Sequence, residues 1–135
     1  KFFDAFGSSR QRNYRKIMKN VHKGKIGEAK AINYLQSLGY NIIQTNYRCA
    51  FGEIDIIAED SGVLVFLEVK SRKNTDFGYP SEAVNYKKQH SIAKTAVTYI
   101  KQKNLFNKPM RFDVVEIIGD SIRVIKDAFT SDIWY

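Results

Sequence analysis

The feature that most constrains the fold is an apolar hairpin pattern that carries charged side chains within it. Two apolar runs, 54–58 and 63–69, flank a short turn signal, which is typical of a β-hairpin. Asp55 interrupts the first run, and Glu68 and Lys70 come at the end of the second. Burying a charge without a partner is costly, so these groups need compensation. A bound metal ion would provide it.

The pairing register predicts that these charged side chains converge. A two-residue loop at 61–62 would place Asp55 directly opposite Glu68. A four-residue loop would move Asp55 opposite Phe66, one diagonal away. Because side chains alternate between the faces of a strand, Glu68 and Lys70 share a face, and Asp55 joins them on that face for either loop. Two carboxylates and an amine gathered in this way form a site for a hard cation, beside a group that could activate water.

Length and composition indicate one globular domain with its own core. The chain has 135 residues, of which 44% are hydrophobic and 13% aromatic, and this argues against disorder. No run approaches the length that spans a membrane, and the first residues are too short an apolar stretch for a signal peptide. The lone Cys49 cannot form an internal disulfide, which favours a reducing compartment. We therefore expect a cytoplasmic protein without a membrane partner.

Positive charge is concentrated at the N-terminus. The net charge is +8, and residues 1–25 contain eight basic residues and one acid. Such a cluster is typical of nucleic-acid binding, although a solvated helix face or a solubilising tail has the same composition. We expect a basic N-terminal helix or arm at 1–22 and a single globular domain at 23–135. The candidate nucleic-acid contacts in the arm are Arg10, Arg12, Arg15, Lys16 and Lys19.

The order of predicted elements is that of an α/β protein with a mixed sheet flanked by helices. A helix is expected at 24–38, followed by a strand at 40–48 and the hairpin. A long helix from Ser81 to about Lys103 leads to a final hairpin, whose strands are 111–118 and 121–126. A tail with several aromatic residues, 127–135, ends the chain. The long helix would connect parallel strands as a crossover.

Two further acids have more than one interpretation. Glu28 lies four residues before Ile32 and seven before Leu35, so it projects from the buried side of its helix. It could favour the helix dipole, or it could reach the carboxylates on the sheet. Asp113 lies inside an apolar strand, where it is either a structural partner of a nearby group or part of the site.

Short motifs spread over residues 23–129 are similar to those of one bacterial family. They are, in chain order, Gly24-x-x-Gly27-Glu28-x-x-Ala31, Asn46-Tyr47-Arg48, Gly52-Glu53-Ile54-Asp55, Phe66-Leu67-Glu68-Val69-Lys70, Phe77-Gly78, Ala83-Val84, Lys88 and Arg111-Phe112-Asp113-Val114-Val115. This set resembles the YraN-like family, itself largely uncharacterised. That family looks like a branch of the PD-(D/E)xK nuclease superfamily, similar to archaeal Holliday-junction resolvases. No proline precedes Asp55 here, and segment 1–22 lies outside the shared pattern.

The resemblance implies a fold, a metal and a set of functional residues. It implies a restriction-endonuclease-like αβββαβ core, in which Asp55 and Glu68 bind Mg²⁺ or Mn²⁺ and Lys70 orients or activates the attacking water. It also implies that Glu28 helps to hold a metal or the substrate phosphate. In related nucleases a polar residue beside the phosphate lies where Lys88 and Gln89 are here. The clustered positive charges add Arg48, Arg72, Lys73 and Lys87 as candidate contacts with the nucleic-acid backbone.

The predicted function is metal-dependent hydrolysis of phosphodiester bonds in structured DNA, such as a Holliday junction. A pair of sites would be needed to cut both strands of a junction, which favours a homodimer. A second interpretation is a non-catalytic nucleic-acid-binding module on the same fold. A third is a structural adaptor that uses the aromatic tail, and it predicts no affinity for nucleic acid.

Overall fold

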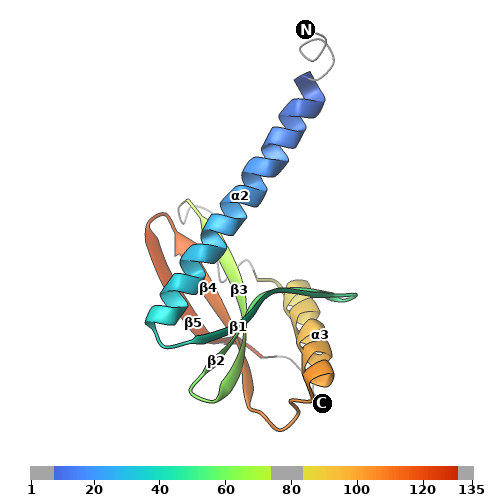
Figure 1. Cartoon of the computed structure of the whole chain (residues 1–135), viewed down its shortest axis with the longest axis vertical. Coiled ribbons are helices and arrows are strands. Elements are labelled where there is room, and N and C mark those ends of the chain that lie inside the picture. The colour runs from blue at the N-terminus through green and yellow to red at the C-terminus, as the bar shows by residue number, and fades with distance from the viewer. Residues whose placement is uncertain (1–7, 74–83, 131–135) are drawn as a thin grey trace.

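The structure, a computed structural model, describes residues 8–73 and 84–130. Its elements, in chain order, are α2 (Ser8–Ser37), β1 (Asn41–Cys49), β2 (Gly52–Asp60), β3 (Val63–Arg72), α3 (Tyr86–Lys103), β4 (Met110–Ile118) and β5 (Ser121–Phe129) (Figure 1). The predicted loop at 74–80 and the last residues of the predicted tail, 131–135, lie outside the described residues.

In the part of the chain that the structure describes, the strands form one sheet in the order β1-β2-β3-β4-β5. β3 and β4 are parallel and are connected through α3, whereas the other neighbours are antiparallel. This arrangement confirms the predicted α/β class and the mixed sheet of a restriction-endonuclease-like core. None of the helices within the described ranges is long and apolar enough to cross a membrane.

The sheet lies between two apolar cores, one beneath each helix. Ile92 and Tyr99 of α3 pack with Phe66 of β3 on one face. Ala31 and Leu35 of α2 pack with the alternate residues of the same strands on the other face. Because β3 is covered on both sides, its sequence is apolar almost throughout.

The β2–β3 turn has the two-residue form. Asp60 pairs with Val63, so Ser61 and Gly62 alone form the loop. Both have positive φ, 51° and 85°, which is typical of the tight turns that match the twist of a hairpin. The register that this turn sets is the one that directs Asp55 towards Glu68.

α2 is one continuous helix that passes through the predicted boundary between residues 22 and 23. The basic segment is therefore the first part of the helix that also packs on the sheet. Figure 1 shows that this first part extends away from the sheet, whereas the second part lies across it. The sheet contacts come from the second part, where Ala31 and Leu35 are buried.

α3 begins at Tyr86, later than the predicted start near Ser81. The Asn85 side chain accepts a hydrogen bond from the Lys88 N–H at 2.9 Å and caps the helix. The tip of the β1–β2 hairpin packs against this helix. Gly52 has a φ of 149°, and a Cβ there would collide with Ser91 Oγ. A glycine is therefore needed at this contact.

Candidate functional site

Asp55 lies where β2 and β3 stop pairing through their backbones. The ladder between these strands runs from Asp60 and Val63 to Ile56 and Leu67. One step further, Asp55 Oδ2 accepts a hydrogen bond from the Val69 N–H at 2.8 Å. The Asp55 carboxylate thus accepts the kind of hydrogen bond that a backbone carbonyl accepts elsewhere between the strands. This bond fixes the carboxylate beside the end of β3.

Glu68 is buried and lies against the Asp55 carboxyl group, with which it shares a hydrogen bond. Burial raises the pKa of Glu68 to about 7, and the negative charge of Asp55 adds to this rise. Burial also raises the pKa of Asp55, against the lowering effect of the Val69 N–H. Near neutral pH, this pair of acids therefore takes up a proton or needs a cation.

Two lysines approach the same carboxylate. Lys70 Nζ lies 4.0 Å from Glu68 Oε1, as expected for residues two apart on one strand face. Lys88 Nζ lies 3.9 Å from Glu68 Oε2 and comes from the first turn of α3. The Asn85 cap described above fixes the backbone of Lys88. The structure therefore brings Asp55, Glu68 and Lys70 together and adds Lys88 from a different element.

Glu28 approaches the same region from α2 without joining the carboxylate pair. Its Oε1 accepts a hydrogen bond from Asn46 Nδ2 at 2.9 Å. Burial raises the pKa of Glu28, the Asn46 hydrogen bond lowers it, and the charge of Asp55 raises it further. Glu28, Asn46 and Asp55 line one cavity of about 370 Å³ between α2 and the sheet. Within the described ranges, no three His, Cys, Asp or Glu side chains are grouped to hold a metal ion.

The donor set suits a hard divalent cation in spite of this. Asp55 and Glu68 offer oxygen ligands, which Mg²⁺ and Mn²⁺ prefer, and Mg²⁺ commonly binds through one or two carboxylates and keeps several waters. The raised pKa values mean that the two charges are poorly compensated by the protein alone. These residues therefore fit the implied metal, and Glu28 lines the same cavity as Asp55.

Two residues of this cavity belong to the short motifs of the sequence but had no role assigned to them. Asn46 has a φ of 51°, and it lies between the paired positions Thr45 and Tyr47 of β1, opposite Asp55. Asparagine tolerates this conformation better than most residues, and an asparagine within a strand pattern was the available signal. Glu53 lines the cavity and forms an ion pair with Arg48 at 2.9 Å.

The predicted nucleic-acid contacts have varied positions. Arg48 is exposed on β1, and Lys87 is exposed on α3. The Gln89 side-chain amide donates to the Val84 carbonyl at 2.8 Å, so it supports the start of α3. Arg72 and Lys73 lie at the end of β3 and line a second cavity.

The arm residues are described less fully. Arg15 is exposed on α2. For Arg10, Arg12, Lys16 and Lys19 the structure describes the helical backbone, and the side chains lie outside what it describes. Their predicted contacts with nucleic acid remain predictions.

Asp113 is a structural partner and faces away from the carboxylate pair. It pairs in register with Leu67, whose side chain belongs to the core under α2, and so it points to the face opposite Glu68. Its carboxylate accepts from Arg111 Nε at 2.9 Å and from the Tyr40 hydroxyl at 2.9 Å. Of the two interpretations of Asp113, the structural one is correct.

Comparisons with known proteins place the chain among bacterial relatives. A family model described as "Uncharacterised protein family UPF0102" matches residues 27–117. A UPF0102 protein of Persephonella marina is 47% identical over 110 residues, which are 82% of this chain and 95% of that protein. A UPF0102 protein of Clostridioides difficile is 51% identical over 114 residues, which are 83% of this chain and 100% of that protein. Neither description states an activity.

Proposed function

The chain belongs to the uncharacterised protein family UPF0102, the YraN-like family of the sequence analysis, and we propose that it is a metal-dependent endonuclease. In this proposal it hydrolyses phosphodiester bonds of DNA with branched or irregular structure, in the manner of a Holliday-junction resolvase. The family description gives no activity, so the support comes from the chemistry of the site.

The observation that carries the proposal is the contact between the Asp55 and Glu68 carboxyl groups. Burial is the main cause of the raised pKa of both acids, and the negative charge of Asp55 raises the pKa of Glu68 further. A fold that keeps such a pair without a metal bears a cost in stability. A fold that binds a divalent cation there recovers this cost, because the cation neutralises both charges.

The residues around the pair have separable roles. A bound Mg²⁺ or Mn²⁺ would polarise the phosphate and lower the pKa of a coordinated water. Asp55 and Glu68 hold it, and the Val69 N–H keeps Asp55 in place. Lys70, 4.0 Å from Glu68, orients or activates the attacking water. Lys88, on the other side of Glu68, stabilises negative charge on the phosphate.

The charges around the site support recognition of the shape of the DNA substrate and not of its base sequence. The exposed cations Arg48, Lys73 and Lys87 surround the site, and the basic arm extends from it on α2. Lysine and arginine contacts of this kind bind phosphates and carry no base information. A homodimer with two such sites would allow paired cuts in a junction.

The alternative is a nucleic-acid-binding module without activity. It has no use for buried carboxylates beside an anionic ligand, which they repel. The two functions differ in a single assay. We propose to incubate a four-way junction, a flap, a single strand, a duplex and an RNA hairpin with the protein in Mg²⁺ or Mn²⁺.

The variants for this assay are Asp55→Asn, which keeps an acceptor for the Val69 N–H, and Lys70→Ala. Glu59→Gln is the matched control, because it removes a carboxylate from the opposite end of β2. We expect metal-dependent cutting that falls about 100-fold or more in both site variants and is unchanged in the control. Tight binding by all four proteins with no cutting of any substrate would establish the binding module instead.

A further inference from the structure

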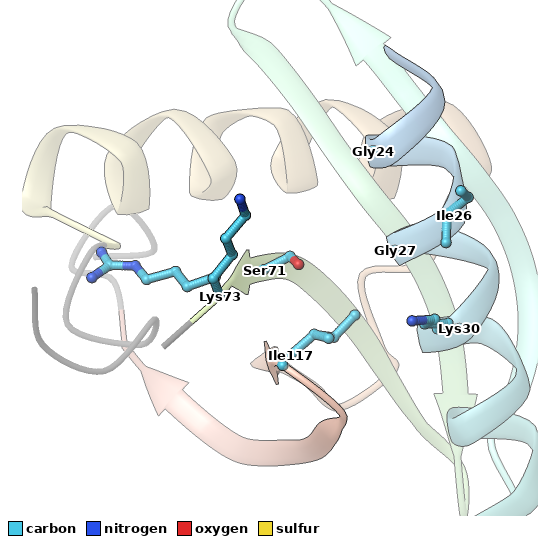
Figure 2. Close-up of a pocket in the computed structure, with 9 residues that line it drawn as sticks. Gly24, Ile26, Gly27, Lys30, Ser71, Lys73 and Ile117 are labelled. Atoms are coloured by element: carbon cyan, nitrogen blue, oxygen red, sulfur yellow. The ribbon is translucent and has the colours of Figure 1, made fainter. Parts of the chain in front are cut away.

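A second cavity lies next to the acidic one, between α2 and the ends of β3 and β4. Its volume is about 480 Å³. Figure 2 shows Lys30 and Ile26 on α2, Ser71 and Lys73 at the end of β3, and Ile117 on β4 around it. It therefore combines cationic groups with apolar surface. None of these features is needed to hold the carboxylate pair.

The two cavities adjoin each other along the helix. Gly24, Gly27 and Ser71 line both of them, so the second cavity leads into the one that contains Asp55. Their combined length follows one side of α2 across the ends of the central strands. Taken together they form a groove. Glu28, Glu53 and Asp55, with Lys25 and Arg48, line one end, and Lys30 and Lys73 line the other, the lysine end.

The two helical glycines are not explained by packing. Glycine is the least favourable residue in a helix interior apart from proline. A Cβ at Gly24 would meet no atom within 4 Å, and a Cβ at Gly27 would make an ordinary contact, 3.9 Å, with Ile117. A larger residue would thus fit the fold at position 24. What the glycines provide is open space in the groove and an accessible helix backbone.

The charges at the lysine end are available to a ligand. Within the described ranges, neither Lys30 nor Lys73 forms an ion pair. Ile26 is 44% exposed, which is a high value for an isoleucine on a helix that packs against a sheet. An anionic ligand with apolar parts would satisfy both features. A single strand of nucleic acid has this composition, because its phosphates alternate with sugars and bases.

We propose that this groove binds a single strand of nucleic acid and guides it to the carboxylate pair. Phosphates contact Lys30 and Lys73, and sugars or bases contact Ile26 and Ile117. The cavity volume lies in the range of small-molecule pockets, so it holds a short stretch of one strand and excludes a duplex. The inference deepens the proposed function: the preferred substrate has an unpaired strand, such as a flap, beside the bond that is cut.

The test uses two groove variants, each with a matched control. Gly24→Met fills the groove, and Ala29→Met places the same side chain on an exposed α2 position outside both cavities. Lys30→Ala removes a groove cation, and Lys103→Ala removes an exposed lysine at the end of α3. Binding of a labelled single strand and of the matching duplex is measured by fluorescence anisotropy in EDTA. Flap cutting is measured separately in Mn²⁺.

We expect the wild-type chain to bind the single strand more tightly than the duplex. Gly24→Met and Lys30→Ala should weaken single-strand binding several-fold, whereas both controls bind as the wild type does. No variant should melt at a clearly lower temperature, and Gly24→Met should melt slightly higher, because methionine favours a helix more than glycine does. Lys30→Ala should also reduce the slope of log affinity against log salt by about 0.7, the value for one lost phosphate contact on a single strand. Unchanged single-strand binding by Gly24→Met, or an equal loss of affinity for the single strand and the duplex, would contradict the proposal that the groove binds a single strand.

The two proposals can fail independently. If the wild-type chain cuts flaps and Gly24→Met cuts them equally well, the nuclease proposal stands and the groove proposal is contradicted. If the wild-type chain cuts no substrate but binds single strands, and Gly24→Met abolishes this binding, the groove proposal stands and the nuclease proposal is contradicted.

Discussion

The environment of Glu68 within the fold does not stabilise its ionised side chain. It is buried, lies against a second carboxylate, and has lysines on two sides that are near it without close contact, at 3.9 and 4.0 Å. The rest of β3 follows the apolar pattern that burial on both faces requires. A departure of this kind from local preference is typical of a functional position.

At Glu68 we predict a pH dependence of stability in the absence of metal. The pKa of Glu68 rises from 4.5 to about 7 on folding, so the folded chain binds more protons than the unfolded chain between these values. Stability should therefore fall as pH rises from 4.5 to 7 and then level off, by up to about 3 kcal/mol. Melting temperatures at pH 5 and pH 8, in EDTA, measure this fall. Glu68→Gln should make it smaller; an identical fall in that variant would contradict the assignment.

Neighbouring lysines at the start of α3 should behave differently. The charge of Lys88 lowers the pKa of Glu68, whereas Lys87 is exposed. Lys88→Ala should raise the pKa of Glu68 further, and Lys87→Ala should leave it unchanged while weakening DNA binding. An NMR titration of the Glu68 carboxyl carbon separates the two. Equal titration curves for both variants would show that Lys88 does not act on Glu68.

At the scale of elements, the hairpin was predictable and the helix ends were not. The apolar runs and the turn signal were enough to predict the hairpin and the convergence of its charged side chains on one face. They left two registers open, and the structure has the one with the two-residue loop, which places Asp55 opposite Glu68. The true start of α3 depends on the Asn85 cap, a local bond that competes with an equally reasonable start near Ser81. The first helix was expected to include residue 38, but α2 ends at Ser37, and Leu38 is 48% exposed.

Contacts between residues of different elements could not be predicted from the sequence either. Asn46 supports Glu28 and Lys88 reaches Glu68 only because β1, α2 and α3 meet at one end of the sheet. Residue spacing describes one element at a time and does not state which elements meet. The two alternatives for Glu28 illustrate this, since its contact with Asn46 depends on how α2 crosses the sheet.

At the element scale we predict that Asp113 stabilises the face of the sheet opposite Glu68. It holds Arg111 and Tyr40, and Arg111 also forms an ion pair with Asp60 at 2.7 Å. Asp113→Ala would leave a partly buried guanidinium without its main partner, at a cost of about 3 kcal/mol. Chemical denaturation measures this cost. Glu59→Ala, which breaks a half-exposed pair with Lys108, should cost about 1 kcal/mol or less. Similar losses in the two variants would contradict the structural role.

The whole molecule is a sheet domain with a long basic helix projecting from it (Figure 1). The buried α2 residues of the core come from the second part of this helix, whereas the backbone of the first part extends away from the sheet. We take this projecting part as the candidate surface for a partner outside the chain. The charge of the segment favours nucleic acid, and a second copy of the chain is the other candidate.

At this scale we predict that the arm supplies much of the salt-dependent affinity and little of the stability. Deleting residues 1–22 removes six basic residues and one acid. The slope of log affinity against log salt for duplex DNA should fall by up to about 5, the value if every one contacts a phosphate, with the melting temperature nearly unchanged. A full-length variant with Arg10, Arg12, Arg15, Lys16 and Lys19 changed to Gln should reproduce the smaller slope, which separates charge from length. Unaltered affinity of the deleted chain at matched salt would remove the arm from DNA binding, and sedimentation velocity on the same proteins would show whether it joins two copies instead.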